Sequence, residues 1–265
     1  MLLSAFCALC WQGKVQADER HYTLAVVPQY TPLLIYRNWQ PLVTRLAEET
    51  GIYLQIKTYP SFRQFLDALR NGEPDFSYLA PYHLVLARRT QDYEPLLRDA
   101  AKQLVGLLLV RKDSAINNIH ELQGKTIAFP SPNAFAASLY MQAWLRKEVG
   151  LDFEALYVGT HDNVYRHVIR GQVDAGSGVN STLANQPPRL QAHLRVLYEV
   201  PGVVAHPLAV HARVPQEDRE RLVSAVKKFI EDEEGRGLLE AVQITQPIDA
   251  DYERDYSSLE SIGLE

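Results

Sequence analysis

Short apolar runs alternate with amphipathic stretches from Tyr22 onward, and this alternation constrains the fold more than any other feature. The apolar runs have the length of buried strands, and the stretches between them carry apolar residues at helical spacing. Such a pattern is typical of βα units around a largely parallel sheet. The strands and helices expected in this first series lie at 22–27, 37–50, 53–58, 62–70, 75–79 and 81–89.

A second βα series follows the apolar strand expected at 104–111 and the polar residues at 112–114, where we place the first crossing between two lobes. The chain is expected to return near 200–206 and to end in helices. We therefore predict an α/β protein with two lobes, each a mostly parallel sheet flanked by helices, and a ligand cleft between them. The expected ranges are 18–107 for lobe 1, 108–202 for lobe 2, and 203–265 for the return to lobe 1. The expected elements of the second series are strands at 125–129, 155–158, 173–175 and 195–198, with helices at 134–148, 163–170 and 179–184.

Composition and charge narrow the class of ligand. Hydrophobic residues make up 46% and charged residues 22% of the chain, as in an ordinary soluble globular protein. The formal net charge is -5, and Lys and Arg form no long run, so nucleic acid is not expected as a partner. A small anion remains compatible with this charge, because a few local donors suffice to bind one.

The first residues indicate export. The segment from Met1 to Trp11 is apolar but too short to cross a bilayer, and Val15-Gln16-Ala17 is a small-x-small cleavage pattern. We predict a signal peptide at 1–17 and a periplasmic mature protein. Both cysteines, Cys7 and Cys10, fall within that peptide, which suits an oxidising compartment.

Two strand-to-helix turns in lobe 2 are candidate anion sites, because helix N-termini expose unpaired N–H groups at a positive dipole end. The first is Gly159–Asn163, where His161 adds a side-chain donor and Asp162 or Thr160 would cap the helix. The second is 130–138, where Ser131 and Asn133 are caps or ligand donors. Both turns are equally compatible with plain, well-capped helix starts.

Lobe 1 offers turns at the carboxyl ends of its expected strands. Tyr82 and Tyr30 could present a hydroxyl and an aromatic wall to the cleft. His83, one residue beyond Tyr82, is interpreted as a surface or packing histidine.

Across most of its length the chain resembles the phosphate/phosphite/phosphonate-type periplasmic solute-binding proteins of ABC transporters. The segments that carry the resemblance are Asp75–Tyr82, Ile116–Lys125, Thr160–Tyr165, Gly171–Gly176 and His206–Val210. The resemblance implies a type II periplasmic binding protein fold that closes about a hinge on a small oxyanion. It also implies that His161 is the phosphonyl-binding histidine and that the turn at 133–135 is the anion loop.

Several ligand positions depart from the family pattern. Where the family carries Ser-Thr-Ser hydroxyls, this chain has Ala134, Phe135 and Ala136. Phe62 replaces a common aromatic hydroxyl, and His206 replaces the acid that pairs with a ligand's amine. Since an imidazole cannot serve an amine as a carboxylate would, an aminophosphonate is not expected.

Catalysis is not expected. His161 and Asp162 are adjacent and cannot easily form the orienting bond of a triad with Ser131, and no nucleophile elbow is present. Neither His-x-x-x-His nor Cys-x-x-Cys spacing occurs in the expected mature chain, so no metal or cofactor is predicted. The expected partner of this monomer is the membrane permease of an ABC transporter. A membrane histidine kinase, to which the protein would present its ligand as a sensor, is the alternative.

Overall fold

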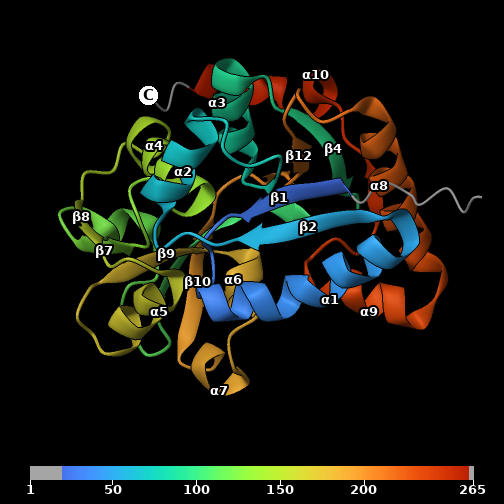
Figure 1. Ribbon diagram of the computed structural model, residues 1–265. Coiled ribbons are helices and arrows are strands. Elements are labelled where there is room, and N and C mark those ends of the chain that lie inside the picture. Colours follow the sequence, from blue (N-terminus) through green and yellow to red (C-terminus); the bar gives the residue numbers. More distant parts are fainter. Residues whose placement is uncertain (1–19, 263–265) are drawn as a thin grey trace, which may run out of the picture.

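The computed structural model describes residues 20–262, which form two lobes joined by a pair of short strands (Figure 1). The predicted signal peptide and both cysteines lie outside the described residues. Each lobe is built around its own sheet, with helices against its faces. Among residues 20–262, no helix combines the length and the apolar character needed to cross a bilayer.

Lobe 1 contains a six-stranded sheet in the order β13-β4-β12-β3-β1-β2. The strands β1, β2 and β3 run parallel, with Ala25 opposite both Lys57 and Ser77. The strands β12 and β13 come from the returning chain and pair antiparallel with their neighbours. The elements of its first segment are β1 (Arg20–Val26), α1 (Pro32–Thr50), β2 (Ile52–Lys57), α2 (Phe62–Arg70), β3 (Phe76–Tyr78), α3 (Pro81–Gln91) and β4 (Glu94–Asp99).

Lobe 2 contains a five-stranded sheet in the order β10-β6-β9-β7-β8, parallel at β9-β7-β8 and antiparallel at β10-β6-β9. Its elements are β6 (Gly106–Arg111), the 3-10 helix η1 (Ile119–Leu122), β7 (Thr126–Phe129), the π-helix η2 (Phe135–Tyr140), α4 (Met141–Lys147), β8 (Glu154–Tyr157), α5 (His161–Ile169), β9 (Ala175–Val179), α6 (Asn180–Ala184), α7 (Pro188–Gln191) and β10 (Leu194–Glu199).

The two crossings between the lobes lie side by side. The outgoing strand β5 (Gln103–Leu104) pairs antiparallel with the returning strand β11 (Val203–Val204). All of β6 belongs to the second sheet, so the outgoing crossing lies before the long apolar strand and not in the polar residues 112–114 that follow it. The return falls within the predicted segment 200–206.

The returning chain completes lobe 1, and its helices α8 and α9 pack beside α1, as Figure 1 shows. Its elements are β12 (Leu208–Val210), α8 (Gln216–Lys228), the 3-10 helix η3 (Phe229–Glu231), α9 (Glu233–Ala241), β13 (Pro247–Asp249), α10 (Tyr252–Asp255) and the 3-10 helix η4 (Ser257–Ile262).

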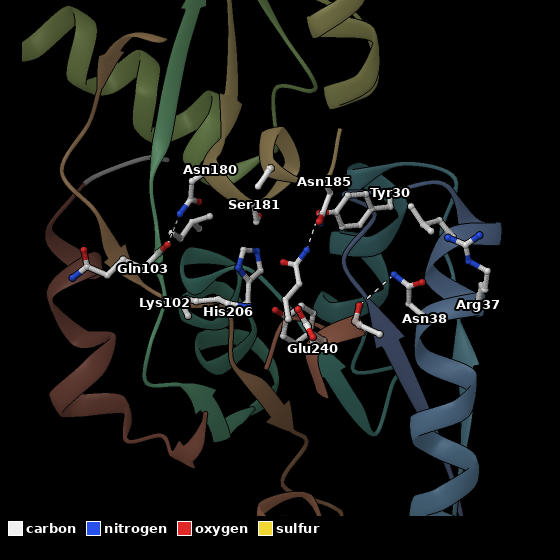
Figure 2. A pocket seen from close by; sticks show the side chains of 17 residues that line it. Tyr30, Arg37, Asn38, Lys102, Gln103, Asn180, Ser181, Asn185, His206 and Glu240 are labelled. Carbon is white, nitrogen blue, oxygen red and sulfur yellow. Dashed lines mark hydrogen bonds between the residues drawn. The ribbon is translucent and has the colours of Figure 1, made fainter. Parts of the chain in front are cut away.

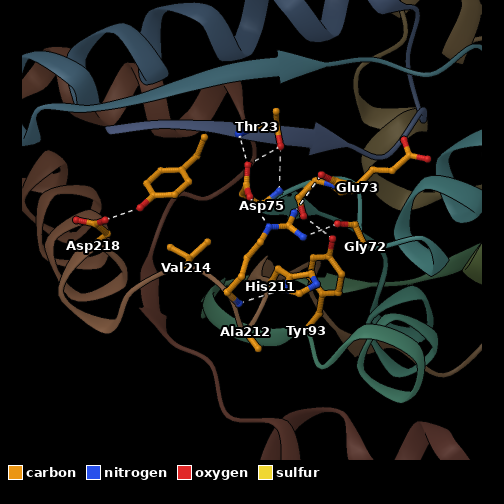
Figure 3. A network of polar contacts seen from close by, with 12 residues as sticks. Thr23, Gly72, Glu73, Asp75, Tyr93, His211, Ala212, Val214 and Asp218 are labelled. Carbon is orange, nitrogen blue, oxygen red and sulfur yellow. Dashed lines mark hydrogen bonds and ion pairs between the residues drawn. The ribbon is translucent and has the colours of Figure 1, made fainter. Parts of the chain in front are cut away.

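A partly buried carboxylate joins the returning chain to the first strands (Figure 3). Asp75 accepts hydrogen bonds from the backbone N–H and the hydroxyl of Thr23, both at 2.8 Å, and from Arg213 Nε at 2.7 Å. Arg213 Nη1 also donates to the carbonyl of Gly72 at 2.6 Å. Three chain segments far apart in sequence are thereby joined through charge-assisted bonds.

Two glycines bring α5 close to the second sheet. A Cβ on Gly176 would lie 2.5 Å from Val164 Cγ1, and one on Gly178 would overlap the hydroxyl of Tyr165. Only glycine therefore allows β9 and α5 to approach this closely. The predicted strand at 173–175 is wrong in position, because β9 runs from Ala175 to Val179 through these glycines.

Candidate functional site

A small cavity lies where the two lobes meet. Its volume is about 10 Å³, which is roughly the room of one water molecule. Lobe 1, lobe 2 and the hinge all contribute to its wall, so the lobes are closed on each other at this point. The lining residues are Val27, Gln29, Phe62, Ala80, Leu104, Ala134, Phe135, Ala136, Ala137, His161, Val179 and His206.

His161 occupies the first position of α5. Thr160 caps this helix, since its hydroxyl accepts from the N–H of Asn163 at 3.2 Å, and the helix thus begins at the cavity. The side chain of His161 is 2% exposed, and its Nδ1 has no hydrogen-bond partner. Burial lowers the pKa of His161 from 6.5 to about 4, so its imidazole is neutral at neutral pH. A neutral imidazole still offers one N–H donor.

His206 reaches the same cavity from the returning chain, directly after the hinge. Its ring stacks on Tyr78 with centroids 5.5 Å apart, and its Nε2 lies 3.0 Å from Gln29 Nε2. Since an amide nitrogen donates, Nε2 of His206 accepts and the ring proton is placed on Nδ1. Burial, and after it the nearby imidazoles of His83 and His161, lower the pKa of His206 to about 3.

His83 forms a direct bond between the lobes. It is fully buried on α3, and its Nε2 donates to the carbonyl of Asn133 in lobe 2 at 3.0 Å. The ring packs edge-on against Phe62. Burial lowers the pKa of His83 to about 4, against the opposing effect of the bond to Asn133. His83 is therefore a packing residue, one of the two roles expected for it. The sequence did not indicate that it would also contact lobe 2.

Ala134 and the first turn of η2 form part of the cavity wall on the side of lobe 2. The carbonyl of Ala134 accepts from Ser138 and Leu139, which makes the first turn π-helical. The expected helix at 134–148 thus begins with a wide turn, a feature that often accompanies functional sites. Phe135 projects from this turn, and its ring stacks on Tyr82 of lobe 1 with centroids 5.8 Å apart.

The cavity wall contains no Lys, Arg, Asp or Glu side chain within residues 20–262. An anion there would therefore meet neutral imidazoles, an amide and the backbone N–H groups at the start of α5. In the same part of the chain, no group of three or more His, Cys, Asp or Glu residues is placed to hold a metal ion. The arrangement suits recognition of a small polar group by neutral donors.

A larger crevice of about 700 Å³ also has His206 in its wall (Figure 2). Tyr30 stands in it, and its hydroxyl accepts from Asn185 Nδ2 of lobe 2 and from Gln243 Nε2 of lobe 1, both at 2.8 Å. Charged side chains line the crevice, including Arg37, Lys102 and Glu240, and all three are exposed. Tyr30 therefore joins the two lobes at this crevice and does not line the small cavity.

The structure brings together five of the candidate residues chosen from sequence, and it places the others elsewhere. The five around the small cavity are His161, Ala134, Phe135, Phe62 and His206. Tyr82 packs behind the ring of Phe135.

The remaining polar candidates make structural bonds. Asp162 accepts from Gln186 Nε2 at 2.8 Å, and Asn163 Nδ2 donates to the carbonyl of Val158 at 2.8 Å. The hydroxyl of Ser131 accepts from the N–H of Asn133 at 3.4 Å. None of these residues lines the cavity, so the structure does not bring them to the candidate ligand site.

Gln29 and His83 are the polar residues at the cleft that sequence reasoning missed as candidates. Gln29 lies in the turn after the first strand, at the edge where ligands of α/β sheets bind, and that position was the available signal. His83 lies at the same kind of edge, after β3, but its burial against Asn133 of lobe 2 could not be foreseen from sequence.

Comparisons with known proteins agree on the family to which the chain belongs. A family model described as "ABC transporter, phosphonate, periplasmic substrate-binding protein" matches residues 24–256. The chain is also 22% identical over 172 residues to the phosphate-import protein PhnD of Mycolicibacterium smegmatis. That match covers 58% of this chain, and it spans about half (53%) of the length of the relative.

Solved structures of similar proteins share the fold. One is the binding protein component of an ABC phosphonate transporter from Pseudomonas aeruginosa, with a TM-score of 0.83, 16% identity, and coverage of 92% of this chain and 86% of that chain. Another is PhnD1 from Prochlorococcus marinus in complex with methylphosphonate, with a TM-score of 0.81, 17% identity, and coverage of 93% and 98%. At these identities the likeness shows the fold alone, and it confirms the predicted two-lobed type II architecture.

Proposed function

The chain belongs to the family of periplasmic substrate-binding proteins of phosphonate ABC transporters, since the family model matches nearly all of its described residues, and we propose that it binds a small oxyanion for import. The ligand would be of the phosphate, phosphite or phosphonate type. It would be held between the lobes and delivered to a membrane permease.

One observation carries this proposal. His161, at the N-terminus of a helix in lobe 2, lies at the same small cavity as Phe62 of lobe 1 and His206 of the returning chain. A ligand at this point contacts both lobes at once. Binding there would stabilise the closed form over the open form, because only the closed form provides all the contacts.

The chemistry of the wall favours a particular kind of oxyanion. The N–H groups at the start of α5 and the imidazole of His161 suit oxygen atoms of the ligand. Phe62, Val27 and Val179 suit an apolar substituent. In the absence of a carboxylate on the wall, a ligand with an amine would lose a solvated charge without gaining a partner. We therefore favour phosphite or a small alkylphosphonate, and the methylphosphonate held by the Prochlorococcus protein supports this choice.

Transport is favoured over presentation of the ligand to a histidine kinase, because the family model describes a component of ABC transporters. Membership of a periplasmic family also supports export, through the signal peptide predicted at 1–17. A monomer remains our proposal for the mature protein.

A melting-temperature panel tests the function. Phosphate, phosphite, methylphosphonate and sulfate would each be added to the mature protein, since a ligand that binds only the folded state raises the melting temperature by mass action. We expect phosphite or methylphosphonate to raise it most. Unchanged melting temperatures with all four anions would refute the proposed oxyanion function.

A further inference from the structure

Phe135 lines the interlobe cavity. Its side chain is 2% exposed, although it projects from the first residue of η2 in lobe 2, and it belongs to the same hydrophobic cluster as the core of lobe 1. The ring lies between Tyr82 of α3 and Tyr140 of η2, stacked on each with centroids 5.8 Å apart. The ring is therefore clamped between the two lobes.

The ring and the free space differ greatly in size. The cavity of about 10 Å³ holds roughly one water molecule. Methylphosphonate has five non-hydrogen atoms, comparable with the six carbons of one phenyl ring. Closed as it is, the site cannot hold both the ring of Phe135 and such a ligand.

Phe135 is also the bulky residue of its turn. Its neighbours Ala134, Ala136 and Ala137 line the same cavity and carry only a methyl group each. Removal of the Phe135 ring would open the space next to these alanines and next to His161.

We propose that Phe135 determines the size selectivity of the site, because its ring occupies, in the closed form, the space that a ligand needs. The proposal rests on the proposed oxyanion function and adds that the ring of Phe135 competes with the ligand for the same space. A ligand must displace the ring from between Tyr82 and Tyr140 before the lobes can close on it. The displacement weakens binding of every ligand, and it weakens binding of a larger ligand more.

Truncation of the ring therefore has an unusual expected effect. Phe135→Ala should bind methylphosphonate roughly tenfold more tightly than the wild type, and it should accept ethylphosphonate. Phosphite, the smallest of the three, should gain least. If the ring were instead a wall that packs against the ligand, the same truncation would weaken binding of both alkylphosphonates.

Calorimetric titration of the mature protein with phosphite, methylphosphonate and ethylphosphonate tests the proposal. The matched control is Phe153→Ala, which removes a buried aromatic ring from the core of lobe 2 away from the cavity and should leave the affinities unchanged. Phe135→Leu is a second, less disruptive variant that should shift the affinities in the same direction. Melting curves without ligand verify that each variant folds.

The outcomes separate the two claims. Tighter binding of methylphosphonate by Phe135→Ala or Phe135→Leu than by the wild type supports the proposal. This includes the case in which a variant binds measurably and the wild type binds too weakly to measure. Equal or weaker binding by both folded variants, with measurable binding by the wild type, overturns the role of Phe135 and leaves the oxyanion function intact. Absence of binding by the wild type and by both variants overturns both claims.

Discussion

Acidification should destabilise the folded chain through its three buried histidines. His83, His161 and His206 are each at least nine-tenths buried, and their pKa values in the folded state are lowered to about 4, 4 and 3. In the unfolded chain each returns to about 6.5. Between these values the unfolded chain binds more protons, so the free energy of unfolding must fall as the pH drops below about 6.5. Above that pH the three groups are neutral in both states and contribute nothing to pH dependence.

The size of the effect follows from the shift. A pKa lowered from 6.5 to about 4 corresponds to a loss of about 3 kcal/mol once the pH is below both values, and to roughly 2 kcal/mol by about pH 5. The partly buried Asp75 and the buried Asp218 titrate lower, since their pKa values lie below the ordinary 3.8. The window from about pH 6.5 to 5 therefore reports mainly on histidines.

Urea unfolding at about pH 7.5 and 5 measures this, with the single variants His83→Gln, His161→Gln and His206→Gln. In each variant the loss of unfolding free energy on acidification should be smaller than in the wild type by roughly 2 kcal/mol. His120→Gln, at an exposed position in lobe 2, is the matched control and should behave as the wild type. Equal pH dependence in the wild type and the three variants would show that these histidines are not buried as neutral groups, and the closed arrangement would be refuted.

Three further variants test the packing that positions the site. Asp75→Ala removes the acceptor that joins three chain segments. It should lower the free energy of unfolding by about 2 to 3 kcal/mol in urea titrations, and a loss below about 0.5 kcal/mol would contradict that role. Gly176→Ala should lower the free energy of unfolding by about 1 to 3 kcal/mol, because its Cβ overlaps α5. Gly237→Ala, with open space around its Cβ position, should leave that free energy unchanged or raise it slightly. The reverse order would refute the close approach of β9 and α5. Tyr30→Phe removes the hydroxyl that joins the lobes at the crevice, and small-angle scattering should show a larger radius of gyration for the unliganded variant than for the wild type; identical curves would exclude a latch at Tyr30.

The fold class could be predicted because the βα pattern is carried by long, regular segments. The helix at α2 illustrates this, since Ser61 caps it and the apolar face formed by Phe62, Phe65, Leu66 and Leu69 is buried as expected. The strand β4 was missed because it contains Pro95 and three charged residues, and its alternating burial depends on neighbours from the returning chain. Short strands such as β5 and β13 are defined by their partners and carry too few residues for a pattern.

The site could be predicted only in part. The sequence placed His161 at the start of a helix, and the cap at Thr160 fixes that position locally. It could not orient Asp162, which the helical turn directs to Gln186 and away from the cavity. His83 shows the other limit, since its burial arises from contact between the lobes and has no local pattern. The position of His161, which local geometry defines, could therefore be predicted, whereas the contact of His83 with Asn133, which forms only on closure, could not.

The central claim is that an oxyanion binds at His161 between the lobes. Calorimetric titration of methylphosphonate into the wild type, His161→Ala and the exposed control His120→Ala tests it most directly. We predict that His161→Ala weakens binding at least roughly tenfold, because a donor to the ligand is lost, while its fold and the affinity of the control are unchanged. Equal affinities in all three proteins would place the ligand elsewhere and contradict the claim.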